Sequence, residues 1–270
     1  MTLILNIIVG AHVIAGFVGL AAFWIPVFAR KGGVSHKRFG AVYANCAYLV
    51  TGSAVIASTG RVVTYQSQGI AVAEAPELYG FALFLGYLGI ATFAAVRQSM
   101  RAVQTRARPD TLRTPMHLGL AWLSIAGSVL VILFALTYWS DASTILLALS
   151  PVGIFTGARM LNLMWNPGVE HMGWFYSHMG SMLGGGIAFH TAFAVFGLQR
   201  IWDYSFAGAL GVLPWILPTL VGVPGIVLST RYYRRKFGPG PVSAGGVGAG
   251  GVGAGGGASP RVAAAPPAVR

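Results

Sequence analysis

The stretch HLGLAWLSIAGSVLVILFALTYW, residues 117–139, decides the fold of this chain. It contains no Asp, Glu, Lys or Arg, and a helix of this length is about 35 Å long. Because the hydrocarbon core of a bilayer is about 30 Å thick, the stretch predicts a membrane-spanning helix. Composition supports the same conclusion for the whole chain: 9% of the residues are charged, against about 25% in soluble domains. The sequence therefore predicts an integral membrane protein.

Six further apolar stretches complete a predicted all-α fold, a polytopic bundle of seven transmembrane spans within residues 1–237. The spans lie at 3–28, 39–59, 78–97, 117–139, 143–160, 178–199 and 207–230. The fifth is the weakest, because it is short, contains Pro151 and ends at Arg159. Residues 238–270 are rich in Gly, Ala and Pro in low-complexity order, so we expect a disordered cytoplasmic tail there.

Positive charge is concentrated in the loops on one side of the predicted bundle. These loops and span ends contain Arg30, Lys31, Lys37, Arg38, Arg97, Arg101, Arg106, Arg108, Arg113, Arg159, Arg231, Arg234, Arg235 and Lys236. The opposite side has only Arg61 and Arg200. Since cytoplasmic loops are enriched in Lys and Arg, we expect the N-terminus outside and the C-terminus in the cytoplasm. The same bias explains the net charge of +12 without a nucleic-acid partner.

The predicted spans contain few groups that can bind an ion. All six acidic residues fall in loops or at span edges, which weakens a proton- or sodium-coupled transporter and an oxygen-liganded divalent cation site. Histidine, methionine, tyrosine and the single cysteine, Cys46, remain. This set suits haem iron or copper better than magnesium or calcium. No hydrolase or zinc-finger motif is present, so no catalytic residue is assigned.

Two histidines lie deep inside predicted spans. His12 stands roughly 14 Å from the outer end of the first span, and His190 about 12 Å below the outer surface in the sixth. Gly16 and Gly186, each one turn away, leave space beside the rings. We therefore predict b-type haem binding by His12 and His190, with Gly16 and Gly186 in the cofactor site. Ordinary close helix packing, which uses the same small residues, is the alternative.

Three further histidines stand at the cytoplasmic edges of alternate spans. His36, His117 and His178 open the second, fourth and sixth spans, and they form a candidate metal site if they converge. The alternative is that each contacts lipid phosphate or caps a helix end. The segments His171-Met172-Gly173 and His178-Met179-Gly180 also offer soft ligands for copper, which we favour less than haem.

Two segments carry a resemblance to known proteins. The pattern His12-x-x-x-Gly16 followed by Ser35-His36-Lys37-Arg38-x-Gly40-x-x-Tyr43 resembles the opening of uncharacterised bacterial membrane proteins of a domain-of-unknown-function family. These have a His-(Lys/Arg)-x-x-Gly-x-x-Tyr element after the first span. The segment WFYSHMG, residues 174–180, resembles a late-span element of related proteins. The resemblance implies a bacterial membrane protein, and we expect the cytoplasmic (inner) membrane.

Together these features favour a histidine-based redox or metal-binding protein, embedded in the lipid bilayer and working with a redox or membrane-protein partner. A channel, a small-solute carrier or a lipid-handling protein is the second hypothesis, with the edge histidines binding phosphates. An accessory or assembly protein without a cofactor is the third. The sequence does not decide whether the protein is an enzyme or what its oligomeric state is.

Overall fold

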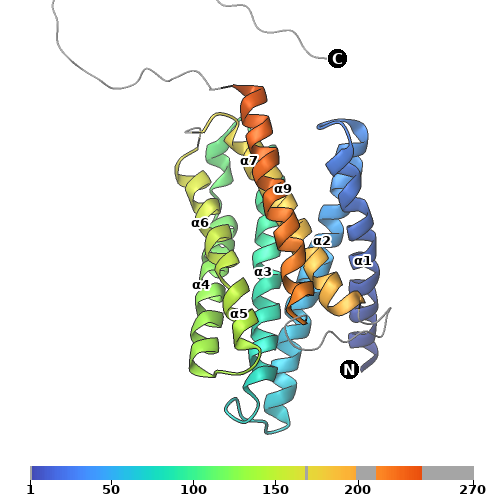
Figure 1. Cartoon of the computed structure of the whole chain (residues 1–270), viewed down its shortest axis with the longest axis vertical. Coiled ribbons are helices and arrows are strands. Elements are labelled where there is room, and N and C mark those ends of the chain that lie inside the picture. The colour runs from blue at the N-terminus through green and yellow to red at the C-terminus, as the bar shows by residue number, and fades with distance from the viewer. Residues whose placement is uncertain (1, 168–169, 199–210, 239–270) are drawn as a thin grey trace, which may run out of the picture. The chain divides into compact units, whose positions relative to one another are not determined.

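The computed structural model describes residues 2–167, 170–198 and 211–238, and within them it is all-helical (Figure 1). The helices are α1 (Thr2–Phe28), α2 (Val34–Ser67), α3 (Pro76–Gln104), η1 (Pro109–Leu112), α4 (Pro115–Thr137), α5 (Ser143–Leu149), α6 (Pro151–Trp165), α7 (Gly173–Ala192), η2 (Phe193–Gly197) and α9 (Leu213–Phe237). Apart from Gly238, the predicted disordered tail lies outside the described residues.

Among the described residues, seven helical segments are long and apolar enough to cross a membrane. Five are single helices, α1 to α4 and α9, while α5 with α6 and α7 with η2 form one segment each. This confirms the predicted all-α, multi-pass membrane bundle.

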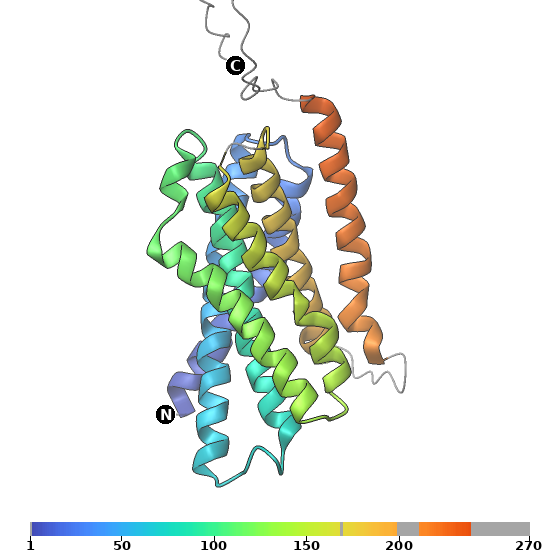
Figure 2. The same cartoon turned by 90° about the vertical axis from the view of Figure 1, so that its left-hand side faces the viewer.

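Helix α3 lies at the centre of the bundle. It packs against α2, α4, α6 and α7, while α1 packs on α2 and α9 on α7 (Figures 1 and 2). Each buried apolar cluster of the described residues includes an α3 side chain: Phe84 in the first, Val96 in the second and Ala94 in the third. Side chains on α3 can therefore contact several other spans at once.

The fifth span is broken at Ser150, directly before Pro151. The proline nitrogen cannot donate a hydrogen bond, so the break leaves backbone groups that need other partners. The Tyr87 and Ser128 hydroxyls both donate to the Ser150 carbonyl at 2.5 Å. The Gly153 amide in turn donates to the Tyr87 hydroxyl at 2.7 Å. Side chains from α3 and α4 thus hold α5 and α6 together as one span.

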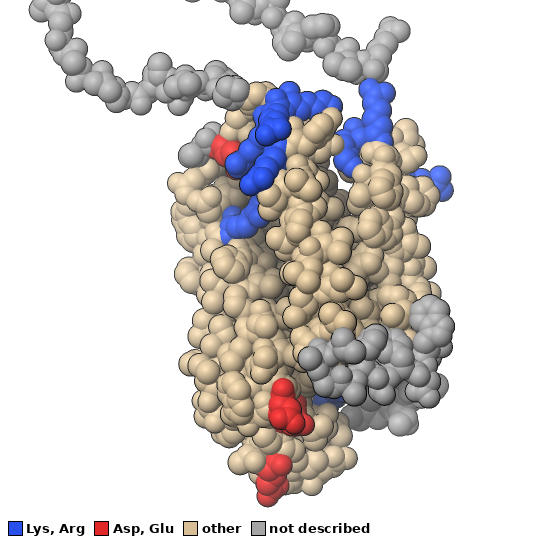
Figure 3. Space-filling view, in the orientation of Figure 1, with Lys and Arg blue, Asp and Glu red and all other residues tan. Residues whose placement is uncertain are grey.

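Lys and Arg gather at one end of the bundle, where α9 ends and α1 connects to α2 (Figure 3). We call this the basic end. It is the end that the positive-inside rule predicts to be cytoplasmic. The orientation itself remains a prediction.

A reporter fused after Lys236 should therefore report a cytoplasmic location, and one inserted after Gln68 should report an external location. The reason is that Arg234, Arg235 and Lys236 end α9 at the basic end, whereas Gln68 follows α2 at the opposite end. Paired alkaline phosphatase and fluorescent-protein fusions measure both positions. The reverse result at either position would overturn the orientation.

Candidate functional site

The ring of His178, on α7, is held by Ser99 of α3. The Ser99 hydroxyl donates to the backbone carbonyl of His178 at 3.0 Å, so it accepts a hydrogen bond from His178 Nδ1 at 2.8 Å. The carbonyl oxygen of Ser99 lies 3.2 Å from the same nitrogen. Since a carbonyl only accepts, the proton of a neutral ring belongs on Nδ1. Nε2 of His178 is then left with a lone pair.

His36 is held in the same way by the end of α1. Its Nδ1 lies 3.1 Å from the carbonyl oxygen of Pro26, which again places the proton on Nδ1. Lys31 donates to the carbonyls of Pro26 and Val27, at 2.9 and 2.6 Å. Burial lowers the pKa of Lys31, because it penalises the charged ammonium. The start of α2 is thus tied to the last turn of α1, and the ring of His36 is fixed at the basic end.

The ring of His36, on α2, makes an edge-to-face contact with the ring of His178, on α7. Their centroids are 6.2 Å apart, and their planes are inclined by 65°. A direct nitrogen-to-nitrogen hydrogen bond would bring two such centroids to about 5 Å. The centroids are therefore too far apart for a direct hydrogen bond between the two rings.

His117 lies apart from this pair. Its ring is fully buried, and its Nε2 is bonded to Oε1 of Gln98 at 2.5 Å. The amide nitrogen of Gln98 donates to the Ser177 hydroxyl at 3.0 Å. Within the described residues no three His, Cys, Asp or Glu side chains converge on a metal position. Of the three edge histidines, the structure brings together His36 and His178, and it places His117 in a bridge from α4 through α3 to α7.

His12 is bonded to α2. Its Nδ1 lies 2.8 Å from the hydroxyl of Ser53, which itself donates to the carbonyls of Leu49 and Val50 at 2.7 and 3.0 Å. His12 is therefore the donor in this bond. A side chain at Gly16 would meet nothing within 4 Å, so the expected open strip beside His12 is present.

His190 has a partner for each ring nitrogen. Its Nδ1 donates to the carbonyl of Gly186 at 2.7 Å, and its Nε2 accepts from the indole nitrogen of Trp24 at 3.2 Å. The expected space at Gly186 is filled, because a Cβ atom there would overlap the ring of Phe23. A haem iron would have to displace Trp24 to reach this nitrogen.

The structure does not bring His12 and His190 together. Trp24, the partner of His190, follows His12 by 12 residues, about 18 Å along α1. A Cβ atom at Gly19 would lie 3.0 Å from the ring of Phe189, the neighbour of His190. The prediction that His12 and His190 lie at the same depth is therefore wrong. Their depths were counted from the ends of two separate spans, whereas the packing of α7 on α1 sets the actual level of His190. Haem binding by this pair remains a prediction that requires His190 to leave Trp24 and the two rings to come together, whereas the Nδ1 bond of His12 leaves its Nε2 available.

Gln98 and Ser99 are the site residues that sequence reasoning missed. They are buried, and they join two of the edge histidines to α3. Two adjacent polar residues near the end of an otherwise apolar span were the available signal. His171, by contrast, is exposed before α7.

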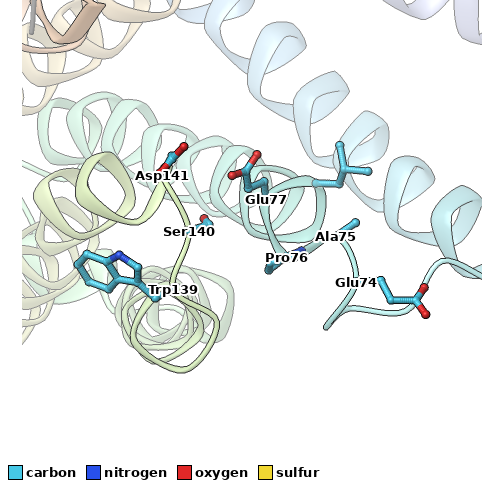
Figure 4. A pocket seen from close by; sticks show the side chains of 8 residues that line it. Glu74, Ala75, Pro76, Glu77, Trp139, Ser140 and Asp141 are labelled. Atoms are coloured by element: carbon cyan, nitrogen blue, oxygen red, sulfur yellow. The ribbon is translucent and has the colours of Figure 1, made fainter. Parts of the chain in front are cut away.

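A hollow lies at the opposite end of the bundle (Figure 4). It has a volume of about 460 Å³ and includes Glu74, Glu77 and Asp141. Figure 4 shows the three carboxylates apart from one another, and Glu74 accepts a hydrogen bond from the amide of Ala71. This hollow contains no histidine and is separate from the pair formed by His36 and His178 at the basic end.

Comparison of the chain with protein-family models, curated proteins and solved structures gave no match. The resemblance stated from its motifs therefore remains an expectation, and the site has to be interpreted from its own chemistry.

Proposed function

We propose that the protein binds a transition-metal centre between His36 and His178 and uses it in electron transfer. The observation that carries the proposal is the 6.2 Å separation of the two ring centroids. Two imidazoles bound on opposite sides of one metal, at about 2.0 Å each, place their centroids about 6 Å apart. The spacing of the pair matches this arrangement.

The hydrogen bonds behind the two rings support the same role. Histidines that bind metals usually donate their other ring N–H to a carbonyl or carboxylate oxygen, which fixes the tautomer and the ring orientation. His36 and His178 both have a carbonyl oxygen at Nδ1, from Pro26 and Ser99. Their Nε2 lone pairs are the ones that remain for a metal.

The surrounding charge favours b-type haem over a bare divalent ion. Lys31 is bonded to the same Pro26 carbonyl as His36, and positive charge there opposes a cation held by two neutral ligands. Haem iron has the porphyrin dianion around it, and its propionates are partners for Lys and Arg. Gly40, one turn after His36, has nothing within 4 Å of its Cβ position, which leaves space beside that ring. Cu(I), with a single charge and a preference for soft ligands, is the second candidate.

Protein purified after expression with added haem should show a reduced-minus-oxidised spectrum of b type. His36→Ala and His178→Ala should each reduce the bound centre by about tenfold or more, because each removes one of two axial ligands. Iron and copper analysis of the same samples distinguishes haem from Cu(I). His171→Ala, at an exposed position, is the matched control and should leave the spectrum unchanged.

Two results would overturn this assignment. One is a wild-type protein with neither haem nor copper in stoichiometric amount. The other is a spectrum that His190→Ala abolishes and His178→Ala leaves intact, which would assign the cofactor to His12 and His190 instead. Circular dichroism of each variant shows whether a lost spectrum reflects a lost fold.

A further inference from the structure

A second hollow at the basic end lies between α2 and α3, separate from the histidine pair. Its volume is about 290 Å³, and its polar lining consists of Asn45, Tyr48, Arg97, Arg101 and Gln104. No acidic side chain lines it. This volume is close to the lower limit of the roughly 300–1,000 Å³ of sites for drug-sized ligands, and the charged lining residues are both arginines, so the hollow suits a small anionic group.

Arg97 brings an uncompensated charge to this hollow. Its Nε atom is buried and has no hydrogen-bond partner. The ion pair found among the described residues is instead Arg234 with Glu170. Arginine is always charged, and a charge within a span without an opposite partner is costly. The position therefore favours binding of an anion.

Arg101 stands one turn after Arg97 on the same face of α3. Its guanidinium donates to neutral oxygens, the Thr111 carbonyl at 3.0 Å and the Gln104 side chain at 3.4 Å. Two like charges at this spacing repel each other. A phosphate between them would remove the repulsion and accept paired hydrogen bonds, which is the geometry that arginine prefers.

The surface beside the hollow becomes apolar one turn beyond Asn45. Leu49 and Ile56 follow Asn45 along the exposed face of α2, and they are 45% and 56% exposed. An acyl chain can lie along this face while its headgroup occupies the hollow. We infer that Arg97 and Arg101 bind the phosphate of an anionic phospholipid whose acyl chain lies on α2.

Native mass spectrometry of the purified full chain, titrated with phosphatidylglycerol and with phosphatidylcholine, tests the inference. Wild-type protein should retain phosphatidylglycerol in preference to phosphatidylcholine. The double variant Arg97→Gln/Arg101→Gln should weaken that binding at least tenfold, and Arg97→Lys should weaken it less, because lysine keeps the charge and loses the fork geometry. Arg108→Gln/Arg235→Gln, which removes the same charge from exposed positions, should retain wild-type binding.

Equal losses in the two double variants would overturn the inference, since they would show a general effect of charge. Undiminished binding in a folded Arg97→Gln/Arg101→Gln protein would overturn it as well. Inorganic phosphate is the third probe: if it binds with the same dependence on arginine while phosphatidylglycerol shows no preference over phosphatidylcholine, the source is a soluble phosphate and the lipid assignment is wrong. His36 and His178 take no part in this site, so the metal assay with the same variants should be unchanged.

Discussion

Replacement of Gly157 by valine should lower the stability of the bundle by about 3 kcal/mol, at the upper end of the usual overpacking range. A Cβ atom at this position on α6 would overlap the backbone carbonyl of Ala121 and lie 2.6 Å from Cγ1 of Ile125 on α4. The carbonyl belongs to a helix backbone, which cannot turn aside as a flexible side chain can. Thermal unfolding in detergent, followed by helical circular dichroism, measures the loss.

Gly119→Val is the matched control, because nothing lies within 4 Å of its Cβ position on α4. Valine there should stay within about 0.5 kcal/mol of wild type, since both residues have low helix propensity and the added side chain meets no neighbour. A similar loss at both positions would contradict the close packing of α4 on α6.

The sequence predicted the spans well where an apolar stretch and a helix coincide. The predicted span 117–139 corresponds to α4, Pro115–Thr137. The helix begins at Pro115 because Thr114 caps its first turn by accepting a hydrogen bond from the amide of His117. It predicted α2 poorly: the span expected at 39–59 is part of a helix that runs from Val34 to Ser67. Hydropathy detects where a chain fits the bilayer, whereas the backbone hydrogen bonds of a helix continue into polar sequence.

The site was predictable in its residue types and less so in its pairings. The recurrence of histidine at span edges indicated the level of His36 and His178, since depth follows from position along a helix. Which rings meet depends on the rotation and tilt of each helix, and these depend on packing across the whole bundle. The partner of His190, for example, is Trp24 of α1, a residue far from it in the sequence.

Gln98→Leu should cost about 2–3 kcal/mol of stability, because it leaves buried polar groups without partners. Gln98 is 2% exposed, and its amide joins His117 Nε2 to the Ser177 hydroxyl. The Nδ1 atom of His117 already has no partner, so the variant leaves the whole ring unpaired in the core. Denaturant unfolding in detergent measures the change. Gln104→Leu, at an exposed position on the same helix, should change stability by less than about 0.5 kcal/mol.

The double variant Gln98→Leu/His117→Leu separates a bonded pair from two independent residues. Replacing both partners with apolar groups removes the buried unpaired imidazole. The loss of stability in the double variant should therefore be about 1–2 kcal/mol smaller than the sum of the two single losses. The metal spectrum of this double variant should persist, because His117 is bonded to Gln98 and stands outside the pair formed by His36 and His178. Additive losses would show that the two side chains act independently. A spectrum lost from a folded double variant would place His117 among the ligands.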